Sequence, residues 1–322
     1  MTRVSPVVAA GLVLTALCCG AVRAQTFPAK PVRLVVPYSA GGGLDMMCRV
    51  VADRLSESLQ QPVVADNRVG ASGTIGTAIV AKAPPDGYTL HCGTNSEITL
   101  AQFVVPDMPY DPERDLTPLT MGVRQAVLLV AHPSVPATNM KELLELARRQ
   151  PVNYGHLGVG HTFYLAMAML SADAQVPFTG IPYKGAAGSV TDVLAGHIEL
   201  AIVNLAPVLQ HIRERRLKPL VVLQPERSAA LPDVPTIREA IGVGVEAPSW
   251  FGFFAPAGLP PDVRARLEQE LRRALADPGV RGKLGAAQME VMGMPSAEFA
   301  EIVRRERAYN GALVKRFNIK PE

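Results

Sequence analysis

The residues best suited to bind an anion lie in a glycine-rich stretch near the start of the chain. The stretch VVPYSAGGGLD, residues 35–45, ends an apolar run in three glycines and then begins a helical pattern. A glycine turn between a strand and a helix brings main-chain N–H groups close to an anion, and the helix dipole adds to the attraction. The sequence therefore predicts an anion site that a carboxylate can occupy without an arginine partner.

Four further polar loops follow predicted strands, at residues 93–96, 158–162, 183–186 and 203–206. In open α/β sheets, ligands bind beyond the carboxyl ends of the strands. We therefore expect these loops to face the same cleft as the glycine turn. The candidate ligand-binding residues are Tyr38, Ser39, Ala40, Gly41, Gly42, Gly43, Leu44, Asp45, Thr94, Asn95, Ser96, His161, Thr162, Lys184, Gly185 and Asn204.

Several of these residues have a second, structural interpretation. Asp45 can support the N-terminus of its own helix in place of contacting a ligand. His161 can form local hydrogen bonds, and Lys184 can lie at the cleft rim or in solvent. Trp250, the only tryptophan, is interpreted as a core residue, with stacking on a ligand as the alternative.

A dinucleotide-binding enzyme is the nearest alternative fold interpretation. A strand, a glycine turn, a helix and a second strand that reaches Asp66 resemble half of a Rossmann fold. The G-x-G-x-x-G spacing fails, however, because Met46 stands where the third glycine would be. The glycine turn alone therefore does not indicate a nucleotide.

The sequence also lacks the common motifs of hydrolases and metal sites. It contains no G-x-S-x-G elbow, no H-E-x-x-H and no P-loop. Its six histidines are not spaced as metal ligands: His91, His132, His156, His161, His197 and His211. We predict no catalytic residue, no metal and no cofactor. A secreted α/β enzyme that acts on a small carboxylate stays open as the alternative.

The first 24 residues resemble a cleavable signal peptide. Arg3 is followed by an apolar stretch at residues 7–20 and by small residues before Gln25. Its removal takes away Arg3 and Arg23 and no acid, so the net charge falls from +3 to +1. A nearly neutral chain with scattered charges is not typical of nucleic-acid binding. The sequence predicts a periplasmic protein.

Short apolar runs alternate with amphipathic helical patterns along the chain. The runs predict strands at residues 32–38, 62–67, 89–94, 126–131, 152–157, 178–183, 198–204, 217–223 and 250–255. The helical patterns cover residues 45–60, 74–82, 141–149, 162–172, 189–195, 206–216, 261–276 and 296–317. This alternation predicts an α/β fold with mostly parallel sheets covered on both faces.

The alternation restarts after residue 125, which predicts two lobes. The last helix carries an apolar stripe that needs an existing core to pack on: Phe299, Val303, Tyr309, Leu313 and Phe317. We therefore predict a discontinuous first lobe, residues 25–124 plus 230–322, and an inserted second lobe, residues 125–229. Two chain crossings would form a hinge, and the cleft between the lobes would be the ligand site.

Two cysteines, Cys48 and Cys92, remain after signal cleavage. Each lies in an apolar pattern, and they share no C-x-x-C spacing. Two buried free thiols are the default interpretation. A single disulfide in an oxidising compartment is the alternative.

Six segments together resemble the Bug-type extracytoplasmic solute receptors of tripartite tricarboxylate transporters. They are FPAKPVRLVVPYSAGGGLD (27–45), ADNRVGASGTIG (65–76), AKAPPDGYTL (81–90), PYKG (182–185), LPDVPTIREAI (231–241) and SWFGFFAPAGLP (249–260). The resemblance implies a type II periplasmic-binding-protein fold whose two lobes close on a small carboxylate. It also implies a protein without catalysis that serves membrane transporter or sensor subunits, and we expect a monomer.

The chain departs from the family pattern at three positions near the expected ligand. Leu44 stands where relatives usually carry Ser or Thr. His161 takes the hydroxyl position of the second-lobe loop, and Tyr164 stands where a histidine would follow. Val203 replaces an acidic residue before Asn204. These changes predict a less polar or larger ligand, such as an aromatic carboxylate.

Overall fold

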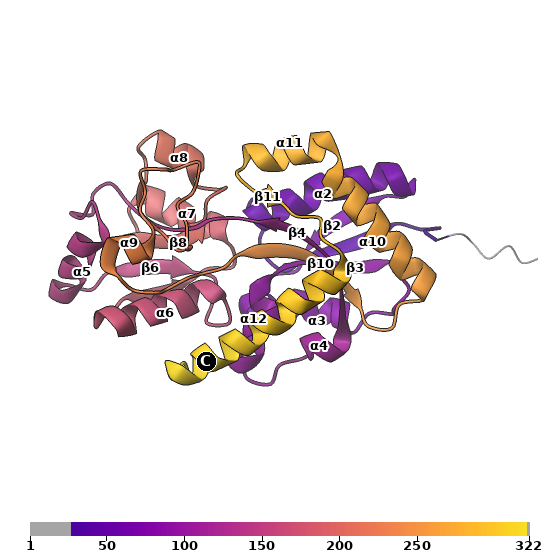
Figure 1. The fold of residues 1–322 in the computed structure, drawn as a ribbon, viewed down its shortest axis with the longest axis horizontal. Coiled ribbons are helices and arrows are strands. Elements are labelled where there is room, and N and C mark those ends of the chain that lie inside the picture. The colour runs from indigo at the N-terminus through magenta and orange to yellow at the C-terminus, as the bar shows by residue number, and fades with distance from the viewer. Residues whose placement is uncertain (1–26, 321–322) are drawn as a thin grey trace, which may run out of the picture.

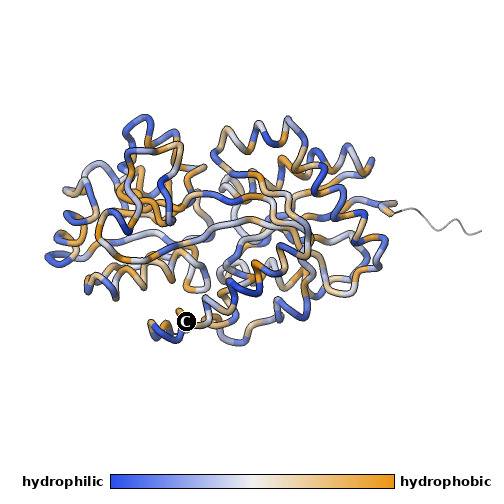
Figure 2. Tube along the Cα trace, in the orientation of Figure 1, coloured by the Kyte–Doolittle hydropathy of each residue, from blue (hydrophilic) through white to orange (hydrophobic). Residues whose placement is uncertain are grey.

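The computed structural model describes residues 27–320 of the chain. The predicted signal peptide, residues 1–24, lies outside the described residues. Two α/β lobes stand side by side, and each is built on one sheet (Figure 1). Hydrophilic and hydrophobic residues alternate along the outer helices (Figure 2), as expected for helices that cover a sheet on one side and meet water on the other.

The first lobe contains a six-stranded sheet in the order β11-β4-β10-β3-β1-β2. Its strands are β1 (Val32–Val36), β2 (Val63–Asn67), β3 (Thr89–Thr94), β4 (Leu116–Arg124), β10 (Trp250–Pro256) and β11 (Glu290–Val291). The second lobe contains a five-stranded sheet in the order β7-β6-β8-β5-β9. Its strands are β5 (Val127–Ala131), β6 (Asn153–His156), β7 (Thr179–Pro182), β8 (Leu200–Asn204) and β9 (Lys218–Val222).

Both sheets are mixed, so the prediction of mostly parallel sheets is wrong in this respect. β1 lies parallel to β2 and β3, and β6 lies parallel to β7 and β8. β10 runs antiparallel to β3 and β4, and β5 runs antiparallel to β8 and β9. β5 and β10 are reversed relative to both of their neighbours, and at each of them the chain arrives from the other lobe and not through a covering helix.

The helices cover the faces of both sheets (Figure 1). In the first lobe they are α2 (Gly43–Leu59), α3 (Thr74–Ala81), α4 (Pro112–Asp115), α10 (Pro261–Ala276), α11 (Pro278–Ala286) and α12 (Ser296–Arg316). In the second sheet's lobe they are α5 (Met140–Arg149), α6 (Thr162–Ala174), α7 (Ala186–Ala195), α8 (Leu209–Arg213) and α9 (Ile237–Ile241). A single π-helical turn, Ser96–Leu100, follows β3.

The apolar face of α2 follows the predicted spacing of four. Met47, Val51, Leu55 and Leu59 are all buried in the core of the first lobe. Burial of each such side chain contributes about 1.5–3 kcal/mol. This packing fixes α2 on its sheet and so fixes the direction in which its N-terminus points.

The apolar stripe of α12 is only partly as predicted. Phe299 and Leu313 are buried, but Tyr309 is half exposed. Position 310 lies on the packed face instead, where Asn310 donates a hydrogen bond to Thr99 Oγ1 at 2.9 Å. Because a helix turns by about 100° per residue, Tyr309 is directed away from the core.

Two adjacent chain segments connect the lobes. The first runs from β4 to β5, and the second leads from the second lobe into β10. They pair side by side, because Trp250 lies opposite Arg124 and the Gln125 N–H donates to the Ser249 carbonyl at 3.2 Å. A pair of adjacent antiparallel crossings is the geometry of a hinge.

The predicted boundaries of the lobes stay a prediction. The sequence predicts that the second lobe ends at residue 229, but α9 packs against α5 and β9. The Ala247 N–H also donates to the Leu223 carbonyl. These contacts favour a return to the first lobe nearer to Ser249.

Cys48 of α2 and Cys92 of β3 form a disulfide, so the default interpretation as free thiols is wrong and the alternative holds. The sheet places β3 next to β1, and α2 packs over both strands. The two Cα atoms are therefore 6.2 Å apart, although 44 positions separate the residues in the sequence. That separation allows a disulfide.

We expect the disulfide to stabilise the first lobe. Loss of a cross-link over a loop of this length costs about 4 kcal/mol in the chain-entropy model. The Cys48→Ala/Cys92→Ala double variant should therefore unfold at clearly lower denaturant concentration than the oxidised protein. Reduction of the wild-type protein is the matched comparison. An unchanged unfolding midpoint in both cases would contradict the expectation.

Candidate functional site

The two lobes touch directly along the cleft. The Ser39 N–H donates to the Lys184 carbonyl at 3.2 Å. The Gly160 N–H donates to Ser72 Oγ at 3.2 Å, and the Thr162 N–H donates to Ser96 Oγ at 3.1 Å. The three serines follow β1, β2 and β3 of the first lobe, and each bond joins one of them to a segment of the second lobe. The structure therefore shows the lobes in a closed arrangement.

A cavity of about 30 Å³ remains between the lobes. Its lining residues are Tyr38, Ser39, Gly42, Gly43, Leu44, Thr94, Leu157, His161, Ala186, Asn204, Ser249 and Phe251. A single water needs roughly 10–15 Å³ by this measure. The cavity is thus much smaller than an organic carboxylate, and such a solute requires the lobes to move apart about the hinge.

The N-terminus of α2 points its first turn at this cavity. The helix begins at Gly43, and Gly42 at the N-cap is extended, with φ −85° and ψ 171°. Gly42, Gly43 and Leu44 all line the cavity, and no side chain among residues 27–320 caps the helix. The N–H groups of a first helical turn have no acceptor within the helix. This end of α2 is therefore free to attract an anion.

The turn before the helix needs glycine for its backbone conformation. Gly41 has a φ of +85°, which only glycine adopts easily. Its N–H donates to Asp45 Oδ2 at 3.1 Å. The glycine turn is thus held in shape by the first turn of its own helix.

Asp45 serves this turn and does not line the cavity. Its carboxylate accepts hydrogen bonds from Arg49 Nε at 2.9 Å and from Asn67 Nδ2 at 3.0 Å. Burial alone would raise the pKa of Asp45, but the hydrogen bonds from Arg49 and Asn67 outweigh it and hold the pKa below its usual value. These contacts favour the helix-supporting interpretation over direct ligand contact.

The structure brings half of the candidate residues to the cavity: Tyr38, Ser39, Gly42, Gly43, Leu44, Thr94, His161 and Asn204. The other candidates lie outside its lining: Ala40, Gly41, Asp45, Asn95, Ser96, Thr162, Lys184 and Gly185. Ser96 and Thr162 join the lobes, and Lys184 lines a neighbouring pocket of about 320 Å³ beside Tyr38. Asn95 is directed away, since its Nδ2 donates to the Pro248 carbonyl and to Glu306.

Four lining residues were not among the candidates: Leu157, Ala186, Ser249 and Phe251. Ala186 lies in the loop at residues 183–186, which the sequence predicts to face the cleft. Ser249 and Phe251 lie in the segment SWFGFF, which is apolar and reads as a core strand. Only the pairing of β10 with β3 and β4 places them at the cavity.

His161 contributes a neutral ring to the cavity. It caps α6, because its Nδ1 accepts from the Phe163 N–H at 3.2 Å, and its ring lies edge-on to that of Tyr38 at 5.7 Å. Burial lowers the pKa of His161 to about 3, so the ring is uncharged at neutral pH. With Nδ1 as acceptor, the proton resides on Nε2, which leaves a donor for a ligand.

Trp250 and Tyr164 are not at the cavity. Trp250 is buried, packs edge-on to Phe299 with ring centroids 5.0 Å apart, and donates from Nε1 to Glu306 at 2.6 Å. The core interpretation of Trp250 is the one its contacts support. Tyr164 packs on His156 and lines a separate outer pocket of the second lobe.

A buried polar cluster lies directly beneath Tyr38. The Tyr38 hydroxyl donates to the Ser72 carbonyl at 3.0 Å and lies 3.2 Å from Glu97 Oε2. Glu97 sits in the π-helical turn and also accepts from the N–H and the hydroxyl of Thr94, each at 2.5 Å. Burial raises the pKa of Glu97 to about 7. Tyr38, which lines the cavity, is thus hydrogen-bonded to Glu97, a carboxyl group with a pKa near neutral pH.

We expect Glu97 to make stability depend on pH. Its pKa is raised from 4.5 to about 7 in the folded protein, so the folded state holds this proton more tightly than the unfolded chain. Its contribution is complete below about pH 4.5 and is lost as the pH rises through about 7. In Glu97→Gln, the melting temperature should fall less across this range than in wild type.

Glu226→Gln is the matched control, because Glu226 is exposed. This variant should keep the wild-type pH dependence of the melting temperature. Equal slopes for Glu97→Gln and wild type between pH 4.5 and 7 would show that Glu97 does not carry the effect.

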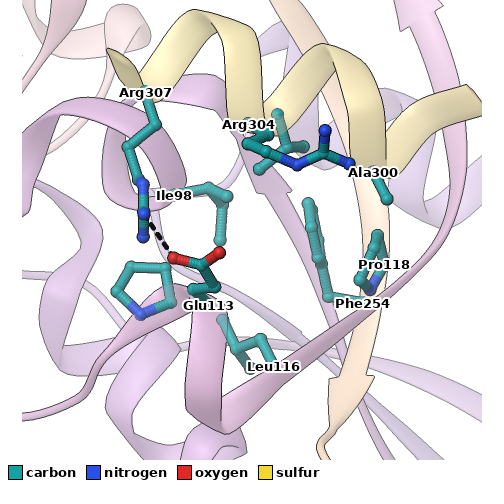
Figure 3. Close-up of a pocket in the computed structure, with 10 residues that line it drawn as sticks. Ile98, Glu113, Leu116, Pro118, Phe254, Ala300, Arg304 and Arg307 are labelled. Atoms are coloured by element: carbon teal, nitrogen blue, oxygen red, sulfur yellow. Dashed lines mark ion pairs between the residues drawn. The ribbon is translucent and has the colours of Figure 1, made fainter.

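An apolar pocket of about 250 Å³ lies elsewhere, between α12, α4 and β10 (Figure 3). Ile98, Leu116 and Phe254 form its walls. Arg307 at its edge forms an ion pair with Glu113 (Figure 3). None of the candidate ligand-binding residues lines this pocket, and it is not part of the interlobe cleft.

Two further properties bear on the class of protein. No helix within residues 27–320 is long and apolar enough to span a bilayer. The same part of the chain contains no group of three or more His, Cys, Asp or Glu residues placed to hold a metal ion.

Two mixed α/β lobes that close over an anion-attracting cavity define a two-lobed solute-binding protein. A model of the tripartite tricarboxylate transporter family receptor, TctC, matches residues 47–319. The chain belongs to this family, as the resemblance of its motifs predicted. The family consists of periplasmic solute-binding receptors and not of enzymes, so the family membership argues against the enzyme alternative.

Individual relatives cover nearly the whole chain. Protein BugT of Bordetella pertussis is 34% identical over 87% of this chain and 86% of its own length. The structure of Rpa4515 from R. palustris with adipate is 34% identical, with a TM-score of 0.87 over 92% of this chain and 100% of that one. MatC from Rhodopseudomonas palustris with bound malate is 29% identical, with a TM-score of 0.85 over 89% and 100%.

Proposed function

We propose that this protein captures a small organic carboxylate between its lobes. The observation that carries the proposal is the uncapped N-terminus of α2, whose first turn lines the cavity between the lobes. Positive charge from the helix dipole and free N–H groups act at this point without a cationic side chain in the lining. The relatives solved with adipate and malate, both carboxylates, support it.

The cavity lining suggests the character of the ligand. Asn204, Ser249 and the Nε2 of His161 supply neutral polar groups, whereas Leu44, Leu157 and Phe251 supply apolar surface. Apolar walls favour a carboxylate with a carbon chain or ring over a densely hydroxylated one. We therefore propose a less polar or larger ligand, in line with Leu44 at a position where a hydroxyl was expected.

The proposed partners are the membrane subunits of a tripartite tricarboxylate-type transporter, or of a sensor. The family description names the transporter. The receptor would act as a monomer in the periplasm, after cleavage of a signal peptide at residues 1–24. N-terminal sequencing of the exported protein should then begin at Gln25, and an N-terminus at Met1 would contradict the cleavage.

A thermal-shift screen tests the binding proposal. Ligand-free protein is mixed with mono-, di- and aromatic carboxylates, including adipate and malate. A ligand at 100 times its dissociation constant should stabilise the folded state by about 2.7 kcal/mol, and the melting temperature should rise. The corresponding alcohols or amides are the controls. No rise with any carboxylate would overturn the proposal.

A methyl group at Gly42 should block the site. Gly42 has a φ of −85°, which alanine accepts, and a Cβ there would have only the Ser39 carbonyl oxygen within 4 Å. Gly42→Ala should therefore fold normally but obstruct the approach of a carboxylate to the α2 N–H groups. We expect at least a tenfold loss of affinity, roughly 1.4 kcal/mol, measured by calorimetric titration.

Gly285→Ala is the matched control, because a Cβ at Gly285 of α11 meets no described residue within 4 Å. It should keep wild-type affinity. Unchanged affinity in Gly42→Ala, with normal folding, would show that the glycine turn does not receive the ligand.

A further inference from the structure

One buried amide near the cavity is not explained by the fold. The side chain of Gln125 is 3% exposed, and neither its Oε1 nor its Nε2 has a hydrogen-bond partner among residues 27–320. A buried donor or acceptor without a partner destabilises a folded protein, so such groups are uncommon. A hydrogen-bond partner for this amide would therefore have to come from outside the described residues.

Gln125 lies at the hinge, beside the N-terminus of α2. Its main chain is held in place, since its N–H donates to the Ser249 carbonyl at 3.2 Å and its carbonyl accepts from Gln224 Nε2 at 3.4 Å. Its Oε1 is 3.5 Å from the point where a Cβ on Gly43 would lie. Phe251 approaches the same point to 3.6 Å. Gly43 and Phe251 both line the cavity.

The neighbours of this point cannot satisfy the amide. The other two groups close to it are the apolar side chains of Met289 at 3.2 Å and Phe251 at 3.6 Å. A polar groove of about 440 Å³ runs along the outside of the hinge, where Arg124, Glu226 and Arg227 lie, and Gln125 borders it. The amide pairs with none of these groups. Its Oε1 lies instead next to Gly43, in the first turn of α2.

We propose that Gln125 is a specificity-determining residue for the carboxylate. When the lobes separate to admit the ligand, the cavity widens at Gly43 and Phe251, and the amide behind them becomes accessible. A half-turn of the amide exchanges Oε1 and Nε2, which brings an N–H group to the side of the α2 N–H donors. The ligand oxygen then accepts from both. This inference rests on the proposed function of the same site.

The arrangement favours ligands that supply an acceptor. In the closed protein the amide is buried and has no partner among residues 27–320, so any ligand oxygen that pairs with it removes a cost already present. A ligand that places an apolar group there leaves the amide unpaired and binds less well. Gln125 would thus help select a carboxylate oxygen at this end of the site.

The test compares Gln125→Met with wild type by calorimetric titration of adipate, malate and the carboxylate that raises the melting temperature of the wild-type protein most. Methionine has a similar length and no hydrogen-bonding amide. We expect the affinity for the bound carboxylate to fall at least about tenfold, the loss typical of a hydrogen bond to a charged group. The melting temperature without ligand should stay the same or rise, because an unpaired buried amide has been removed.

Two further variants sharpen the result. Gln125→Glu should bind even less well, because a second carboxylate repels the ligand. Gln102→Met is the matched control, since the Gln102 Nε2 is also buried without a partner in the part of the chain that the structure describes, but Gln102 lies in the turn Ala101–Phe103 and not at the hinge. It should keep wild-type affinity.

Each outcome bears on a different claim. Wild-type affinity in a folded Gln125→Met or Gln125→Glu protein would overturn the role of Gln125 and leave the carboxylate receptor standing. Absence of binding in the wild-type protein itself, for adipate, malate and every other carboxylate of the thermal-shift screen, would overturn the inference together with its premise. A loss of affinity shared equally by Gln102→Met would also count against a specific role for Gln125.

Discussion

The site depends on one electrostatic constraint. The N–H groups in the first turn of α2 are not capped by any side chain within residues 27–320. Ser, Thr, Asp and Asn are the residues preferred at the N-cap, where their side chains satisfy such groups. Here the N-cap is Gly42, and the nearest carboxylate, Asp45, is turned back onto Gly41, Arg49 and Asn67. The helix end therefore keeps its attraction for an anion from outside the chain.

The rest of the first lobe holds this helix end in position. The buried face of α2 and the disulfide from Cys48 to Cys92 fix the helix on the sheet. Beneath the cavity, Tyr38 rests on Glu97 in a π-helical turn, a type of distortion that is often found at functional sites. A rigid wall of this kind holds the N–H groups in place before a ligand binds, so binding does not carry the entropy cost of ordering them.

The second lobe supplies the opposite wall and the possibility of movement. Ser39, Ser72 and Ser96 of the first lobe accept or donate directly to loops of the second. These few bonds can break when the lobes move apart. The two crossings, paired at Gln125 and Ser249, keep the lobes connected. Closure about these crossings brings His161 and Asn204 to the helix end, so the site is complete only when both lobes meet.

The sequence by itself determined the glycine turn, the helix that follows it, the alternation into two lobes and the family, because these depend on local spacing and on short motifs. It missed β4, whose Pro118 and Gly122 are poor strand formers, and it favoured free thiols. Only the tertiary structure decided the pairing of Cys48 with Cys92, the placement of Ser249 and Phe251, and the isolation of the Gln125 amide. Each of these depends on residues far apart in the chain, whose proximity no local pattern records.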